Sequence, residues 1–256
     1  MLKLNHINKY YNAGTVNEMC LFRDFNLSIE DGQFVSVVGS NGSGTSMLNI
    51  ICGSIPVDQG TIEIGGVDIT NMPEYKRQRR IGRVYQDPAR GTCPHMTILE
   101  NMSLADNKGK PFNLLPGTNR QRVDDYRESL KSLGLGLEDK MNVKVGVLSG
   151  GQRQAMALLM STMTPIEFLI LDEHTAALDP KTAEVIMELT DKVVKEKKLT
   201  TIMVTHNLRY AVEYGDRLLM MHQGQAIMDK AGKEKKEIQI DDILEKFNAI
   251  SIECGN

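Results

Sequence analysis

Leu148-Ser149-Gly150-Gly151-Gln152-Arg153-Gln154 is the stretch that decides the fold of this 256-residue chain. A serine, two glycines and a glutamine open a segment with a helical pattern. The start of such a helix presents backbone N–H groups and the positive end of the helix dipole, so it can hold an anion. The stretch alone predicts an anion site, and its partners elsewhere in the chain make that prediction specific.

Two further stretches flank it in the sequence. Upstream, the glycine-rich run Gly39-Ser40-Asn41-Gly42-Ser43-Gly44-Thr45-Ser46 follows the apolar run Phe34–Val38 and precedes a helix over Met47–Cys52. Strand, loop and helix in this order are the context that a phosphate-binding loop requires. Downstream, the apolar strand Phe168–Leu171 ends in Asp172-Glu173.

The pattern around these stretches predicts an α/β protein with a parallel sheet, since strands alternate with helices from residue 148 onward. Short apolar runs bounded by glycine predict early strands, and Asp31-Gly32 and Gly65-Gly66 read as turns between neighbouring strands. The expected strands are Leu2–Ile7, Leu27–Ile29, Phe34–Val38, Thr61–Ile64, Phe168–Leu171 and Thr200–Val204, and the expected later helices run from 148 to about Met163 and over Pro180–Glu196.

Residues 88–147 contain few strand signals, and helical ones over Thr97–Leu104 and Arg122–Leu133. Thr97 and Glu100 there have the spacing of a capping box. We therefore predict a core of residues 1–87 and 148–230, an inserted helical subdomain over 88–147, and a C-terminal extension over 231–256. The amphipathic segment Ile240–Phe247 of that extension should pack on the core or fray.

Composition limits the class of protein. A net charge of −3 gives no reason to expect nucleic-acid binding, and the basic cluster Lys76–Arg80 reads as a solvated face. Four cysteines without metal-type pairing fit a reducing cytosol. No apolar run approaches the roughly 20 residues of a membrane span, and the first 30 residues lack a signal-peptide pattern. We expect a soluble intracellular protein that reaches a membrane only through a partner.

The combination of Gly39–Ser46, Leu148–Gln154 and Phe168–Glu173 resembles the ATP-binding subunit of an ABC (ATP-binding cassette) transporter over nearly the whole chain. The resemblance implies a P-loop NTPase core with an antiparallel β subdomain and an inserted helical subdomain. It also implies ATP and Mg²⁺ as ligands and ATP hydrolysis as the activity. The run Asp172–Pro180 looks like subunits assigned to amino-acid (tryptophan/tyrosine-type) uptake systems.

The resemblance assigns roles residue by residue. Asp172 would hold Mg²⁺ through water, Glu173 would act as general base, and His206 would contact the γ-phosphate. Gln86 would sense Mg²⁺ and the attacking water. Tyr11 would stack on adenine, and the adjacent Tyr10 could exchange roles with it.

The signature stretch has a role between subunits. In this family Ser149, Gly150, Gly151 and Gln152 cap the γ-phosphate bound to a second subunit in a head-to-tail dimer, so the monomer should be almost inactive. The second nucleotide-binding subunit is expected to be an identical chain. Separate membrane subunits would place the complex at the inner face of the cell membrane, and Met96–Met102 resembles the segment that meets them.

The phosphate loop departs from the family because it has no lysine. Its glycines keep the backbone cradle for phosphate, which Ser40, Asn41 and Ser43 complete. In one alignment Thr45 replaces the lysine and Ser46 keeps the Mg²⁺ role. In the other the lysine is deleted and Thr45 becomes the Mg²⁺ ligand, which preserves the following helix face and is slightly favoured.

The missing charge has a cost. A unit charge pair at about 4 Å contributes about 4 kcal/mol at an effective dielectric of about 20, or roughly three decades in affinity or rate. We therefore expect weakened ATP binding and slow hydrolysis. The alternative function is a nucleotide-binding regulatory cassette with little turnover. A soluble ABC protein of translation or DNA repair is disfavoured, because those carry two cassettes or a long coiled-coil insertion.

Overall fold

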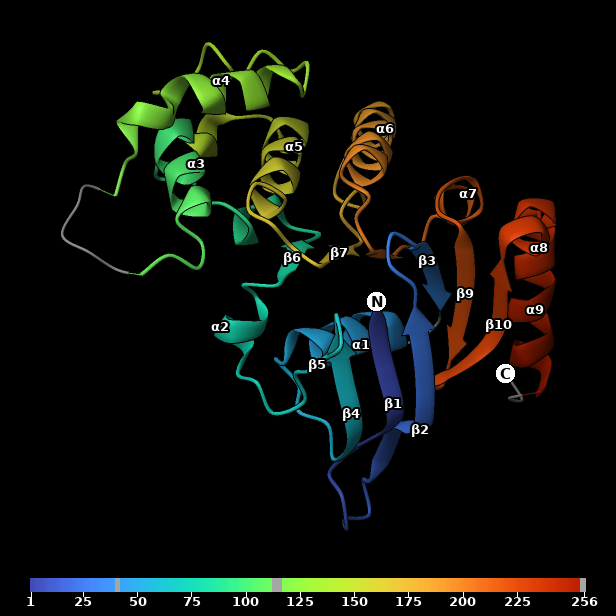
Figure 1. Cartoon of the computed structure of the whole chain (residues 1–256). Coiled ribbons are helices and arrows are strands. Elements are labelled where there is room, and N and C mark those ends of the chain that lie inside the picture. Colours follow the sequence, from blue (N-terminus) through green and yellow to red (C-terminus); the bar gives the residue numbers. More distant parts are fainter. Residues whose placement is uncertain (40–41, 112–116, 254–256) are drawn as a thin grey trace. The chain divides into compact units, whose positions relative to one another are not determined.

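The computed structural model describes residues 1–39, 42–111 and 117–253, the last four of these by their backbone alone. The chain divides into two compact units (Figure 1). Unit 1 consists of Met1–Asn71 and Thr200–Asn256, and unit 2 of Met72–Leu199. This division cuts across the predicted core, whose boundaries with the helical subdomain and the extension stay a prediction.

Unit 1 contains an antiparallel sheet in the order β2-β1-β4-β5. The strands are β1 (Leu2–Tyr11), β2 (Met19–Ile29), β4 (Gln59–Ile64) and β5 (Val67–Asp68). Leu2 pairs with Ile29 on one side and Ile64 on the other, so alternate side chains gather in one core. The strand β1 continues past the predicted end at Ile7, because an irregularity with His6 at φ 52° carries the pairing onward.

The second sheet region of unit 1 is mainly parallel. Strand β3 (Phe34–Gly39) pairs in parallel with β8 (Thr201–Val204) and β9 (Arg217–His222), and β10 (Gln225–Ala231) pairs antiparallel with β9. Strands that are buried on both faces have continuous apolar sequences, as β3 and β8 do. Neither β9 nor β10 was predicted, although Leu218–Met221 is an apolar run of the same kind.

The two predicted turns behave differently. Gly65-Gly66 joins the paired strands β4 and β5, as expected. Asp31-Gly32 is also a turn, with the Gln33 N–H donating to the Glu30 carbonyl at 3.1 Å. However, it connects β2 and β3, which belong to different sheets, so the expectation of neighbouring strands at this turn was wrong.

Unit 2 contains two parallel strands, β6 (Ile81–Val84) and β7 (Phe168–Asp172), in the register Ile81↔Phe168 to Val84↔Leu171. Its α-helices are α2 (Glu74–Arg77), α3 (Ile98–Asp106), α4 (Val123–Lys131), α5 (Gly150–Ser161) and α6 (Pro180–Lys197). Short 3-10 turns cover Pro88–Arg90, Arg120–Arg122 and Val145–Val147. The described part of 88–147 thus contains helices and one isolated β-bridge, Thr97↔Lys144.

Sequence chemistry explains where the helices of unit 2 begin. Thr97 caps α3 and forms the predicted capping box with Glu100. Asp179 caps α6, its carboxylate accepting from the Thr182 N–H at 3.1 Å, and Pro180 follows at the first helical position.

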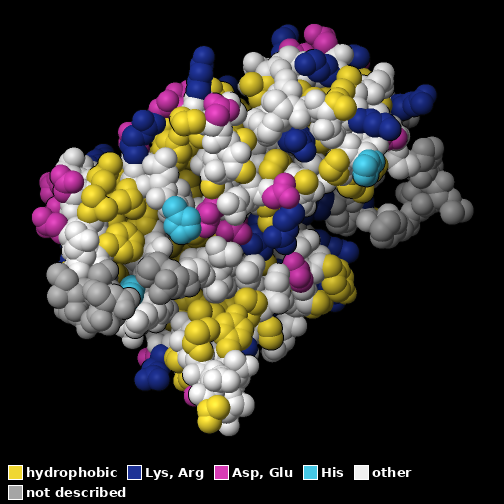
Figure 2. All heavy atoms as spheres, turned by 180° about the vertical axis from the view of Figure 1, so that it is seen from behind, with side chains coloured by type: hydrophobic (Ala, Val, Ile, Leu, Met, Phe, Trp, Pro, Cys, Tyr) yellow, Lys and Arg dark blue, Asp and Glu magenta, His cyan; other side chains and the backbone are white. Residues whose placement is uncertain are grey.

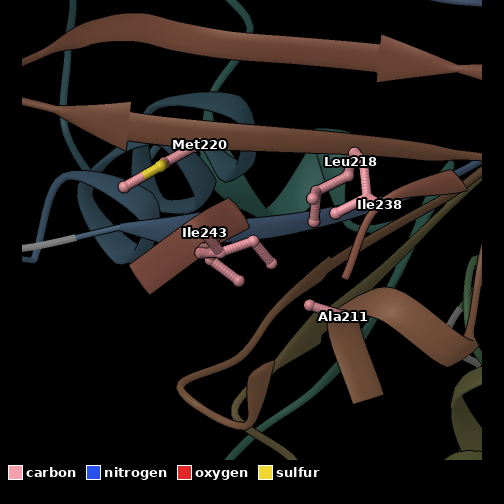
Figure 3. Close-up of a cluster of buried hydrophobic side chains, with 6 residues drawn as sticks. Ala211, Leu218, Met220, Ile238 and Ile243 are labelled. Carbon is pink, nitrogen blue, oxygen red and sulfur yellow. The ribbon is translucent and has the colours of Figure 1, made fainter. Parts of the chain in front are cut away.

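The C-terminal extension is part of unit 1 and packs on its other elements. Helix α8 (Gly232–Glu237) is fastened by Lys235, whose Nζ donates to the Tyr214 carbonyl at 3.1 Å beyond α7 (Leu208–Glu213). Helix α9 (Ile240–Glu253) places Ile243, 0% exposed, in a cluster with Val38 and with side chains from α7 and β9 (Figure 3). Of the two predicted outcomes, packing is the one observed for these residues.

The surface differs from the prediction at the basic cluster. Arg77 is only 3% exposed and its Nε donates to the Met72 carbonyl at 2.7 Å. Arg80 forms a two-bond pair with Glu167 at 2.5 and 2.7 Å. Reading all of Lys76–Arg80 as a solvated face was therefore wrong, since two of its arginines brace unit 2. On the face shown in Figure 2, acidic and basic side chains are interspersed. Among the described residues, no helix is long and apolar enough to cross a membrane.

Candidate functional site

The phosphate loop lies at the carboxyl end of β3 in unit 1, where open parallel sheets bind ligands. Gly42, at φ 70°, precedes helix α1 (Ser43–Cys52), and no described side chain caps that helix. A Cβ on Gly39 would lie 2.7 Å from the Met221 carbonyl oxygen, so only glycine fits there. The helix begins earlier than the predicted Met47, because the loop glycines pass directly into its first turn. Ser40 and Asn41 lie outside the described residues.

Thr45 and Ser46, the two candidate Mg²⁺ ligands of the loop, are both half-buried in the first turn of α1. Behind them Met47 and Leu48 face the core, at 1% and 0% exposure. Helix α1 is uninterrupted, with the Ser46 N–H donating to the Gly42 carbonyl at 3.0 Å. The alignment in which the lysine is deleted preserves this buried helix face. The hydroxyls of Thr45 and Ser46 both remain candidate Mg²⁺ ligands.

His206 is exposed two residues beyond the end of β8, also in unit 1. Its neighbours fix the backbone on either side. The Thr205 N–H donates to the Val37 carbonyl at 3.0 Å, and the Asn207 side chain caps α7 by accepting from the Tyr210 N–H at 3.3 Å. The imidazole is thus carried on a short segment held at both ends.

Tyr11, the candidate adenine platform, lies at the end of β1 and is half-buried, as is Tyr10. The Lys9 Nζ lies 5.8 Å from the centroid of the Tyr11 ring. Lys9 in turn pairs with Asp58 at 3.0 Å. Asp58 also accepts from the Tyr10 N–H at 2.7 Å, and this bond, followed by Lys9, holds the pKa of its carboxyl below the usual value.

The acidic strand end belongs to unit 2. Asp172 ends β7 and is buried, and its Oδ2 accepts from a terminal nitrogen of Arg83 on β6 at 2.6 Å. Glu173 follows with φ 48°, a left-handed conformation that non-glycine residues rarely adopt. Such strain persists where the surrounding structure enforces it, and it is concentrated at functional sites.

Gln86 is exposed two residues beyond the end of β6. The preceding backbone is anchored by Gln154, a fully buried residue of α5, whose Nε2 donates to the Tyr85 carbonyl at 3.0 Å. Helix α5 begins at the signature stretch, so this bond connects the signature helix directly to the segment that carries Gln86.

The signature stretch forms a complete capping box. The Ser149 hydroxyl accepts from the Gln152 N–H at 3.2 Å, and Gln152 Oε1 accepts from the Ser149 N–H at 3.2 Å. Gln152 Nε2 donates in addition to the Leu135 carbonyl at 3.2 Å. These bonds organise the start of α5, and the anion site expected at this helix terminus stays a prediction.

The two signature glycines permit close packing of α5 on α6. A Cβ on Gly151 would lie 2.3 Å from Cγ2 of Thr182, and one on Gly150 would lie 3.3 Å from Cδ2 of Leu178. The sequence assigned both glycines to the anion site, and their packing role was not foreseen. Leu178 belongs to the loop that follows Glu173, so signature and acidic motif share a packing interface within unit 2.

The residues present fit a magnesium nucleotide. Helix α1 has no acidic residue in its first turn and an uncapped glycine before it, which suits a polyanion. The hydroxyls and the carboxylate assigned to Mg²⁺ are the hard oxygen ligands that this ion prefers. Among the described residues, no three His, Cys, Asp or Glu side chains gather into a metal-binding group.

The structure groups the candidates by unit. Unit 1 contains Tyr11, Gly39, Gly42, Ser43, Gly44, Thr45, Ser46 and His206, and unit 2 contains Gln86, Ser149, Gly150, Gly151, Gln152, Asp172 and Glu173. Sequence reasoning missed Arg83 and Gln154. Arg83 could have been noticed as the one charge in the apolar run Ile81–Val84.

Comparison with known proteins identifies the family. A family model described as "ABC transporter" matches residues 22–176. A tyrosine transport ATP-binding protein of Clostridioides difficile is 47% identical over 96% of this chain and 98% of its own length. A phosphonates import ATP-binding protein of a Ruegeria species is 32% identical over 90% and 88% of the two chains.

Solved structures agree. A dimeric ATP-binding cassette in a post-hydrolysis state with ADP and Pi matches with a TM-score of 0.75 and 31% identity, over 90% of this chain and 98% of that one. A nucleotide-free cassette from an ABC transporter matches with a TM-score of 0.80 at 23% identity, which supports the fold alone. The chain belongs to the ABC transporter family, as an ATP-binding subunit with the α/β fold and the ATPase activity of a P-loop NTPase.

Proposed function

We propose that this chain hydrolyses ATP to drive uptake of an aromatic amino acid through separate membrane subunits, and that its hydrolysis is slow because the phosphate loop lacks a lysine. The observation that carries the proposal is the intact acidic strand end. Asp172 is buried and oriented by Arg83, and Glu173 follows it in a strained conformation. A cassette without turnover would have no use for this arrangement.

In this proposal each candidate residue has its own role in binding or hydrolysis. The loop glycines and the N–H groups of α1 cradle the phosphates, while Thr45 or Ser46 and Asp172 hold the Mg²⁺ ion, which withdraws charge from the phosphates when bound. Glu173 accepts the proton of the attacking water. His206 and Gln86 orient the γ-phosphate and that water, and Tyr11 stacks on the base.

Two kinds of partner are proposed. Ser149–Gln152 caps the nucleotide of a second identical subunit, so ATP binding should depend on dimerisation more than in a cassette with the lysine. The dimeric state of the similar cassette supports this assembly. Membrane subunits encoded separately would contact the helices of 88–147 and hold the complex at the inner face of the cell membrane.

The substrate class rests on similarity to the tyrosine transport ATP-binding protein. The test is reconstitution in proteoliposomes with the membrane-spanning and solute-binding proteins of an aromatic amino-acid uptake system. ATP hydrolysis should rise with external tyrosine or tryptophan and not with glutamine. Equal rates with all three amino acids would contradict the substrate class.

The regulatory cassette is the second candidate, and the absence of a phosphate-loop lysine favours it. The two functions separate when ATP affinity and phosphate release are measured for the native chain and for two lysine variants. One variant inserts lysine between Gly44 and Thr45, and the other is Thr45→Lys. Slow hydrolysis predicts a gain in turnover of up to about three decades in the better variant. Equal turnover in all three chains would refute the lysine argument.

A further inference from the structure

Arg83 is a buried charge in a strand that is otherwise apolar. Its side chain is 10% exposed and pairs with Asp172, which is 11% exposed, at 2.6 Å. Removing two charges from water costs several kcal/mol per ion, so a buried pair is weak evidence for a stabilising role. A pair that includes a candidate Mg²⁺ ligand calls for a functional explanation.

The guanidinium of Arg83 is held on more than one side. Its central carbon lies 4.7 Å from the centroid of the Tyr85 ring, and Arg90 lies at the same distance from that ring. The carbonyl of Tyr85 is fixed by Gln154. Because a guanidinium does not lose its proton in a protein, Arg83 is a permanent positive charge at a defined place.

That place is the carboxyl end of β7, directly before Glu173. Asp172 contributes a negative charge where the proposed function puts a triphosphate, and like charges repel. In a cassette with a phosphate-loop lysine, that lysine offsets the repulsion. Here Arg83 on the neighbouring strand is a cation in contact with Asp172.

We propose that Arg83 is a positioning residue that acts through Asp172: it cancels the carboxylate charge toward a bound nucleoside triphosphate and thereby compensates for the missing phosphate-loop lysine. The inference rests on the proposed function. Arg83 and a phosphate-loop lysine would then reduce the same electrostatic repulsion. Their effects on ATP affinity are therefore not additive.

The test is a double-mutant cycle on ATP affinity, measured by calorimetry both with Mg²⁺ and in EDTA. Arg83→Met should weaken ATP binding by about tenfold to a hundredfold, including in EDTA, since the charge acts on the phosphates without the metal. Arg83→Lys should stay within about threefold of the native chain. Arg90→Met is the matched control, because it removes the other cation on the Tyr85 ring, and it should leave affinity unchanged.

The lysine insertion between Gly44 and Thr45 completes the cycle. It should raise affinity at least about tenfold more in the Arg83→Met chain than in the native chain. Equal gains in the two backgrounds would show that Arg83 does not replace the lysine. Tighter binding of Mg²⁺-ATP by Arg83→Met would show that Arg83 competes with the ion, and would also overturn the inference.

Folding is controlled separately. Arg83→Met leaves Asp172 buried without this partner, so the cycle is repeated in an Asp172→Asn background, where the pair carries no unpaired carboxylate. In EDTA, Arg83→Met should leave ATP affinity within about threefold in that background, because no carboxylate charge remains for Arg83 to cancel. Thermal denaturation of Arg83→Met in the Asp172 chain checks that this variant is folded. An equal loss of affinity in both backgrounds refutes the inference. If neither the native chain nor the lysine variants bind ATP, the proposed function fails as well.

Discussion

The phosphate loop of unit 1 and the acidic strand end of unit 2 have the same local plan and opposite electrostatics. Each follows a parallel strand, β3 or β7, and each passes through a residue with positive φ, Gly42 or Glu173. The loop contains the phosphate-loop glycines and no lysine. The acidic end retains its carboxylates and has a buried arginine beside them. Backbone shape and charge can therefore be separated in such a site, because different atoms supply them.

The largest expected effect comes from removing one carboxylate of the acidic strand end. Glu173→Gln should lower ATP turnover by about 10²- to 10⁴-fold, because the general base is lost, while ATP affinity stays within about twofold. Phosphate release and calorimetric binding, measured in the native and the lysine-inserted chains, check this. Glu188→Gln, at an exposed position of α6, is the control. A parallel fall in affinity would mean that Glu173 supports binding and not the chemical step.

The next effect tests what supports the phosphate loop. Ile243→Ala removes a fully buried side chain from the cluster that contains Val38, the residue before Gly39. It should lower the free energy of unfolding by about 2–5 kcal/mol and weaken ATP binding. Urea denaturation and calorimetry measure both. Leu244→Ala, at a 43% exposed neighbour, should change stability by less than about 0.5 kcal/mol. Unchanged ATP affinity in Ile243→Ala would show that packing of the C-terminal extension does not support the phosphate loop.

A smaller effect tests the packing beside the acidic end. Gly151→Ala places a methyl group 2.3 Å from Cγ2 of Thr182 and should cost about 1–3 kcal/mol of unfolding free energy. Thr182→Ser removes that methyl group and keeps the N–H that Asp179 accepts. The double variant should therefore recover most of the loss in thermal denaturation. Simple addition of the two single effects would show that the contact does not limit α5–α6 packing.

The smallest effect concerns pH. His174 is buried after Glu173, its Nε2 lies 3.1 Å from the Thr190 hydroxyl, and burial lowers the pKa of the imidazole from 6.5 to about 4. Below pH 6.5 the unfolded chain binds the proton more readily, so the stability from neutral His174 is present above pH 6.5 and is lost as pH falls toward 4.

Urea denaturation at pH 7.5 and 5.5 measures this loss. The native chain should lose about 1.4 kcal/mol more than His174→Gln, which does not titrate but keeps an N–H donor. His95→Gln, at an exposed position, should behave as the native chain does. Identical losses in all three chains would exclude His174 as the source.

The sequence also has limits that particular residues make clear. It predicted the capping box at Thr97, the helix that starts at the signature stretch and the strand before Asp172, since these depend on neighbours within a few residues. It missed β9 and β10 and the burial of Arg77, because strand pairing and burial depend on residues far away in the chain. The kink at His6 likewise hid the second half of β1, where the alternation of buried side chains changes phase.

By itself the sequence determined the family, the phosphate loop without its lysine, and the acidic and signature motifs, because each is a short pattern whose chemistry lies in its own residues. Only the tertiary structure decided that Arg83 meets Asp172 across two strands separated by more than 80 residues of chain. It also decided that Gln154 anchors the segment before Gln86, and that α9 lies behind β3. The physical reason is that charge pairing, anchoring and burial act through space, and a pattern read along the chain contains no distances.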